Sequence, residues 1–110
     1  METPLWPKIK ALTDEVYRQT AKMPKSELNN FISQMHRAVD SIGSNFSEGY
    51  GRLTKDDFRH FMAMARGSAN EVAGQADICG DLGFIAEPAK IIDLAYDVAC
   101  GLTRLIKSAS

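Results

Sequence analysis

The chain has little of what would mark a secreted or membrane-spanning protein. Only two of its 110 residues are cysteines, Cys79 and Cys100, and their spacing is not that of a CxxC zinc or redox motif. Both lie in helical patterns at positions that suit an apolar side chain, so we expect two free, buried thiols, with a disulfide as the alternative. No apolar run approaches the roughly 18 residues of a membrane helix, and no signal peptide is recognisable. These absences favour a cytoplasmic protein that does not enter membranes.

Charge of one sign is also lacking. Lys and Arg number 13 and Asp and Glu number 14, for a net charge of −1. Four successive segments carry +1, 0, −2 and 0, namely residues 1–24, 25–52, 53–83 and 84–110. The molecule as a whole therefore has no basic field that would attract nucleic acid.

Hydrophobic periodicity predicts an all-α, single-domain protein over residues 1–110. Apolar residues recur at helical spacing in four stretches, which we assign to helices at about 5–22, 26–49, 55–82 and 88–107. The connections between them are short, and no strand-like alternation interrupts them. The pattern predicts an antiparallel up-down-up-down four-helix bundle.

Local signals set the helix ends. Pro24 closes the first helix, and Ser26 is the expected N-cap of the second. The second helix should end at Gly49-Tyr50-Gly51, where a glycine supplies a positive φ for a tight corner. Thr54 with Asp57 predicts a capping box at the start of the third helix. Pro88 suits the first turn of the fourth.

A polar stripe follows the second helix on the side roughly opposite its apolar face. Its members recur at spacings of three and four residues: Gln34, Arg37, Ser41, Asn45 and Glu48. Ser and Asn are mediocre helix formers because their side chains compete for backbone hydrogen bonds. Their presence on this face indicates groups that meet a partner, with an ordinary solvated surface as the alternative.

The third helix carries a line of small residues opposite its core face. The line consists of Ala63, Gly67, Asn70 and Gly74. A glycine inside a helix costs about 1 kcal/mol relative to alanine, and close approach by another helix would explain two of them; drift on a tolerant surface is the alternative. Ser68, Glu71 and Gln75 flank this line and could face the polar stripe, for example through an Arg37–Glu71 hydrogen bond. These residues predict an interface with another subunit.

The stretch Gln34 to Arg52, reading QMHRAVDSIGSNFSEGYGR, resembles the signature of four-helix-bundle proteins called 23S rRNA intervening-sequence proteins. Further matches are Trp6, Val16-Tyr17, Pro24, Ala65-Arg66-Gly67-Ser68 with Glu71, and Leu82-Gly83. The chain departs from the family pattern at His36, where Arg is usual, and at Phe46-Ser47, where Ile-Ala is usual. The resemblance implies a small bundle that assembles into homopentamers, without a settled biochemical activity. Distant relatives, the accessory proteins of diversity-generating retroelements, bind nucleic acid.

Basic residues gather around the expected corner between the second and third helices. Arg52, Lys55 and Arg59 could contact phosphates there, and Tyr50 could stack on a base. Asp56 and Asp57 lie in the same stretch and weaken its positive charge. A capped, solvated helix start is the plain alternative.

No catalytic, metal or cofactor motif is recognisable. A di-iron bundle would need two Glu-x-x-His motifs, and the chain offers only Asp57-x-x-His60. We therefore expect a homo-oligomeric scaffold or interaction protein that is not an enzyme and takes no small-molecule substrate or cofactor. A nucleic-acid-binding module is the alternative.

Overall fold

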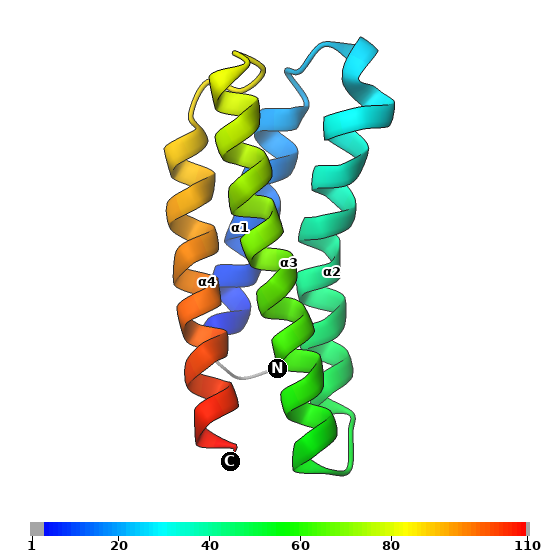
Figure 1. Cartoon of the computed structure of the whole chain (residues 1–110), viewed down its shortest axis with the longest axis vertical. Helices are drawn as coiled ribbons and strands as arrows, with labels where there is room; N and C mark the ends of the chain where they lie inside the picture. Colours follow the sequence, from blue (N-terminus) through cyan, green and yellow to red (C-terminus); the bar gives the residue numbers. More distant parts are fainter. Residues whose placement is uncertain (1–3, 110) are drawn as a thin grey trace.

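The computed structural model describes residues 4–109, and four α-helices run side by side in it (Figure 1). They are α1 (Leu5–Thr20), α2 (Ser33–Tyr50), α3 (Lys55–Asp81) and α4 (Pro88–Ser108). No strand occurs between residues 4 and 109, which confirms the predicted all-α class with four helices. The bundle measures 43 × 23 × 20 Å, and α3 packs most extensively, against α4 and α2.

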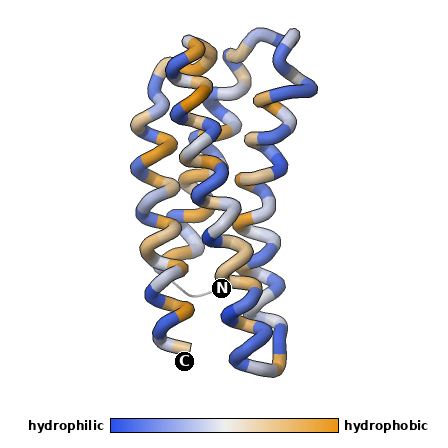
Figure 2. Tube along the Cα trace, viewed as in Figure 1, coloured by the Kyte–Doolittle hydropathy of each residue, from blue (hydrophilic) through white to orange (hydrophobic). Residues whose placement is uncertain are grey.

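The core lies on the predicted apolar faces. Each helix contributes fully buried side chains, for example Leu12, Phe46, Met62 and Leu102. Hydrophobic and hydrophilic residues alternate in short stretches along every helix, as expected for helices with one buried face (Figure 2). Four residues of the predicted apolar faces are only half-buried and pack against the core from its edge: Phe31, Phe58, Phe61 and Leu105. Leu28 is a further apolar residue in the range predicted for the second helix, and its side chain lies outside the described part of the structure.

The approach to α2 differs from the single helix predicted to start at Ser26. After α1 ends at Thr20, a 3₁₀ turn spans Lys25–Glu27 and a π-helical segment spans Leu28–Ile32. The Glu27 N–H donates to the Pro24 carbonyl at 2.9 Å, so Ser26 lies inside a turn and is not an N-cap. Asn29 and Asn30 are poor helix formers, which is consistent with regular α-helix starting only at Ser33.

The predicted positive φ at the end of α2 is wrong. Gly51 caps the helix with φ −88°, and among the described residues only Gly83, after α3, has a positive φ, at 77°. Gly49 is instead required by packing. A Cβ built there would lie 3.1 Å from Phe61 Cβ and closer still to the Met62 methyl group. The corner glycine therefore lets α2 and α3 approach each other.

The cysteines are both free, in line with the main prediction. Cys79 is buried, and burial raises the pKa of its thiol. Cys100 is only half-buried, contrary to expectation, because its position on α4 faces away from the core. Its thiol beside the Tyr96 hydroxyl raises the pKa of that phenol.

The first turns of α3 and α4 are stabilised by different hydrogen bonds. The Thr54 hydroxyl accepts a 3.1 Å hydrogen bond from the Asp57 N–H, which is one of the two hydrogen bonds of the predicted capping box. Pro88 opens α4 as predicted, but the preceding Glu87 has no side-chain cap. The Gln19 amide, buried on α1, takes over this role. It donates to the Glu87 carbonyl at 2.9 Å and accepts from the Glu87 N–H at 3.1 Å.

Replacing Gln19 with leucine should lower the free energy of unfolding by about 1–2 kcal/mol, because the Glu87 N–H loses its partner and the Glu87 carbonyl keeps only the Lys90 N–H. Urea unfolding followed by circular dichroism measures this loss. The matched control is Arg18→Gln on the same turn, which removes the ion pairs of an exposed guanidinium to Glu15 and Glu87 and should cost less. Equal losses in the two variants would contradict a capping role for Gln19.

Candidate interaction surfaces

A polar network joins the predicted stripe of α2 to the flank of α3. The hydroxyls of Ser41 and Ser68 are 2.7 Å apart, and the Asn45 amide donates to the Ser41 hydroxyl and carbonyl at 3.1 and 2.9 Å. Ser41 therefore has a serine and an amide as partners and no histidine or carboxylate, so its surroundings provide no base that would activate it as a nucleophile.

Further along the same seam, the Gln75 amide donates to Gln34 Oε1 at 3.3 Å and to Glu71 Oε2 at 3.2 Å. The suggested Arg37–Glu71 hydrogen bond does not form between these described residues; Glu71 instead accepts from Gln75 on its own helix. Gln75 Oε1 is buried and has no hydrogen-bond partner in the described structure. Buried carbonyl oxygens are rarely left unpaired, so this seam has an unused acceptor.

The small-residue line of α3 is exposed in the single chain. A Cβ at Gly67 or Gly74 would have no neighbouring atom within 4 Å. Three apolar side chains lie beside the two glycines, on the side nearer α2. They were not among the residues predicted from the sequence. They are Met64, Ile78 and Leu82, with 37, 51 and 54 % of their surface exposed. We refer to these five residues as the α3 strip.

The corner between α2 and α3 brings together its predicted cations, but carboxylates neutralise two of them. Arg52 pairs with Glu48 at 2.8 Å and lies over the Phe61 ring, 4.6 Å from its centroid. Arg59 pairs with Asp56 and also donates to the Ala109 carbonyl. Lys55 is exposed and forms no ion pair within residues 4–109.

Tyr50, the predicted stacking residue at this corner, is 43 % exposed. Its ring packs edge-on against Phe46 and Phe58, with centroids 5.1 and 5.2 Å away. Burial raises the pKa of its phenol. The ring is thus already held by two aromatic neighbours.

Positive and negative side chains gather toward different ends of the bundle, although the net charges of the four successive sequence segments do not show this. One half contains the 51–54 corner together with the start of α1 and the end of α4 (Figure 1). This basic half, residues 4–9, 44–66 and 101–109, has seven Lys and Arg against three Asp and Glu. The acidic half, residues 10–43 and 67–100, has six against ten. The net charges are thus +4 and −4.

A cluster on the acidic half joins α1 to α2. The Tyr17 hydroxyl donates to Asp40 Oδ2 at 2.8 Å, and its ring stacks on His36 with centroids 3.9 Å apart. The Thr20 hydroxyl is 2.8 Å from His36 Nε2. Burial and the Asp40 carboxylate raise the pKa of Tyr17, so the phenol is not prepared to ionise.

The described residues contain no group of three or more His, Cys, Asp or Glu side chains that could hold a metal ion. None of the helices in residues 4–109 has an apolar stretch of the length that crossing a membrane requires.

Comparison with known proteins decides the family. The family model described as 23S rRNA-intervening sequence protein matches residues 1–104. The chain belongs to this family. No curated protein matches it. Among solved structures, the chain is similar to a protein of unknown function from the S23 ribosomal protein family of Bacteroides thetaiotaomicron. The TM-score is 0.70 at 20 % identity, and the match covers 91 % of this chain and 98 % of that one. At this identity the likeness shows the fold alone.

The family motif maps onto the geometry described above. Ser41, Asn45 and Ser68 form the α2–α3 network, Gly49 lies at the close approach of the two helices, and Arg52 pairs with Glu48. The motif therefore lies mostly along one seam of the bundle.

Proposed function

We propose that this antiparallel up-down-up-down bundle is a non-catalytic scaffold or interaction protein that acts as a homo-oligomer in the cytoplasm. The family resemblance points to a homopentamer. The observation that carries the proposal is the α3 strip, where exposed Met64, Ile78 and Leu82 adjoin two helical glycines. An exposed apolar strip is costly in a monomer and is typical of a surface that meets another chain. Two free thiols suit a reducing compartment.

The polar seam beside the strip would give the interface its specificity. Gln34, Arg37, Ser41, Asn45 and Glu48 from α2, with Ser68 and Glu71 from α3, would then lie at or beside the contact. A donor from a second subunit could reach the unpaired Gln75 Oε1, and polar groups of this kind fix register between subunits. The α3 strip would supply most of the buried apolar area.

Size-exclusion chromatography with light scattering, at micromolar protein, tests the assembly. We expect one species with several times the mass of the 12.1 kDa chain, and five times for a pentamer. A monomer at every concentration would refute the proposal.

A second candidate function is nucleic-acid binding, favoured by the +4 charge of the basic half. The suggested distant resemblance to accessory proteins of diversity-generating retroelements, which bind nucleic acid, also supports this function. The contacts predicted from the sequence are Arg52, Lys55, Arg59 and Tyr50. In a ring whose subunits are parallel, the basic halves would lie together and multiply phosphate contacts. Its test is affinity for RNA or DNA that falls steeply with salt.

A further inference from the structure

The end of α4 carries cations that no carboxylate neutralises. Arg104 and Lys107 lie on the outward side of α4, with Lys8 of α1 and Arg66 of α3 on its two flanks. None of these four residues forms an ion pair within the part of the chain that the structure describes. Arg52 and Arg59 at the corner are both paired. We refer to Lys8, Arg66, Arg104 and Lys107 as the α4 cationic face.

Two hollows lie on this face and share Arg104. The larger, between α3 and α4, has a volume of about 410 Å³ and is lined by polar groups that include Arg66, Asn70 and Thr103. The Arg66 guanidinium donates to the Thr103 hydroxyl at 3.2 Å, which holds it in this hollow. The Thr103 hydroxyl already donates to the Ala99 carbonyl. Because Arg66 and Asn70 can still donate hydrogen bonds, and no Asp or Glu lines the hollow, it suits an anion.

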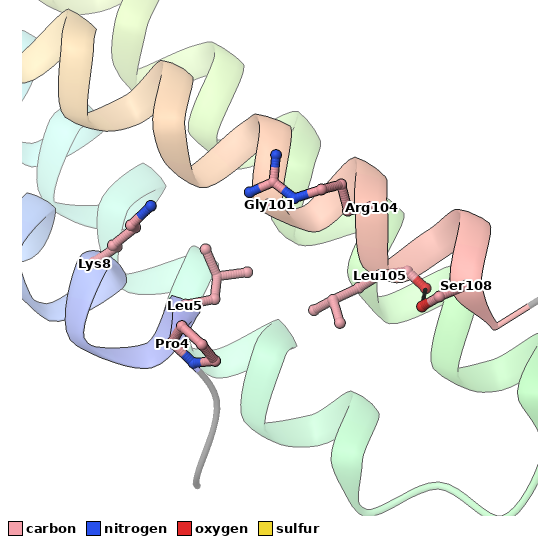
Figure 3. A pocket seen from close by; sticks show the side chains of 7 residues that line it. All are labelled: Pro4, Leu5, Lys8, Gly101, Arg104, Leu105 and Ser108. Carbon is pink, nitrogen blue, oxygen red and sulfur yellow. Dashed lines mark hydrogen bonds between the residues drawn. The ribbon is translucent and has the colours of Figure 1, made fainter.

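The smaller hollow lies between the start of α1 and the end of α4 and measures about 270 Å³. Lys8 of α1 and Arg104 of α4 come from opposite sides of it, and Leu5 and Leu105 also line it from these two helices (Figure 3). Again no carboxylate lines it. The two hollows together form a cationic path across α4, from Lys8 through Arg104 to Arg66.

An aromatic side chain lies at one end of this path. Tyr96 lines the larger hollow, and 68 % of its surface is exposed. Unlike Tyr50, it has no aromatic neighbour within the described residues. Its ring is therefore free to stack on a planar group. The next residue in the sequence, Asp97, is negatively charged, so the cationic path ends at Tyr96.

We propose that the α4 cationic face binds single-stranded nucleic acid, with phosphates on Lys8, Arg66 and Arg104 and a base stacked on Tyr96. The inference rests on the nucleic-acid function proposed above and relocates its contacts from the corner to α4. Cations combined with an exposed aromatic ring are the means by which proteins hold single strands without reading sequence. The bases of a duplex are stacked on one another inside it and cannot stack on Tyr96. An acidic peptide would make only apolar contact with this ring.

Fluorescence anisotropy of a short labelled single-stranded RNA, titrated with the full-length protein over a salt series, tests the proposal. Three phosphate contacts predict a slope of about −2 for log affinity against log salt. Arg66→Gln and Arg104→Gln should each weaken binding and reduce the steepness of that slope by about 0.7, while Arg66→Lys should retain most of the affinity. Tyr96→Ala should weaken binding about fivefold, and Tyr96→Phe should not.

The matched control is Lys90→Gln, which removes one charge from an exposed position of the same helix in the acidic half. It should leave both affinity and slope unchanged. A wild-type protein that binds no RNA at low salt would refute the nucleic-acid function itself. Binding that survives Arg66→Gln and Arg104→Gln but is lost in Arg52→Gln or Arg59→Gln would keep that function and overturn the α4 assignment. Tighter binding of a polyglutamate peptide, or of duplex RNA, would overturn the choice of ligand.

Discussion

Replacing Gly67 or Gly74 with leucine is expected to separate the oligomer into folded monomers. Both positions are exposed, and a Cβ at either would meet no atom of its own chain within 4 Å. Leucine is also a better helix former than glycine, so neither substitution should unfold the subunit. If a second subunit approaches the α3 strip closely, however, a leucine side chain keeps the two helices apart. Light scattering should report a mass near that of one chain, with the helical circular dichroism signal retained.

The matched control for these variants is Ala89→Leu, which places the same side chain at an exposed position near the start of α4. It should leave the oligomer intact. Assembly that persists in both glycine variants would show that the strip is not an interface. Assembly lost in all three would indicate that added apolar surface, rather than its place on α3, causes the change.

The helices and their buried faces could be predicted because burial follows the helical period closely. Phe46, Met62 and Leu102 are each spaced three or four residues from other buried positions of their own helix, and that spacing is visible in the sequence. The Thr54 cap could also be predicted, because it involves residues only three apart. Such features depend on neighbours along one helix.

Features that join distant parts of the chain could not be predicted in the same way. Gln19 pairs with the backbone of Glu87, 68 residues away, and nothing near Gln19 distinguishes it from a surface amide. Ser41 meets Ser68 across two helices; the sequence predicted that this flank of α3 could face the polar stripe, but not which residues would pair. The suggested Arg37–Glu71 pair is absent from the described structure, where the Glu71 carboxylate accepts from Gln75 on its own helix.

Charge sums along the sequence did not reveal the division of charge between the two halves, for a geometric reason. Because each helix runs from one half of the bundle to the other, sums over successive segments average the two halves. The α3 helix begins with Lys55, Arg59 and Arg66 and ends near Asp77 and Asp81; α4 has the reverse order, from Asp93 and Asp97 to Arg104 and Lys107. Only the three-dimensional arrangement places the two sets of cations together.

Helix stability alone does not account for this division. Anions favour the first turn of a helix and cations the last, by about 0.3–1 kcal/mol each. The α4 helix follows that rule, with Lys107 in its last turn. The α3 helix follows the rule at its start, where Asp56 and Asp57 outnumber Lys55, and opposes it at its end, where the last turn holds Asp81 and no cation. The acidic end of α3 is therefore the part of this division that the helix dipole does not favour.

Replacing Gly49 with leucine is expected to have the opposite effect from the same change at Gly67: the subunit itself should lose stability. Gly49 is buried where α2 meets α3, and even a methyl group there would press on Met62 and lie 3.1 Å from Phe61 Cβ. A leucine adds three further carbon atoms. Overpacking of this kind costs about 1–3 kcal/mol or more, which exceeds the gain of about 1 kcal/mol from replacing a helical glycine. Urea unfolding of Gly49→Leu should therefore have a lower midpoint than the wild type.

The matched control is Gly51→Leu, two residues after Gly49. Gly51 caps α2 at an ordinary φ of −88°, is exposed, and its added Cβ would come no closer than 3.5 Å to the Glu48 carbonyl. Gly51→Leu should therefore leave the unfolding midpoint nearly unchanged. If the two variants lost equal stability, glycine would be needed at the corner for its backbone freedom. A loss confined to Gly49→Leu would instead show that glycine serves there to bring α2 and α3 together, the contact that also aligns the Ser41–Ser68 seam beside the α3 strip.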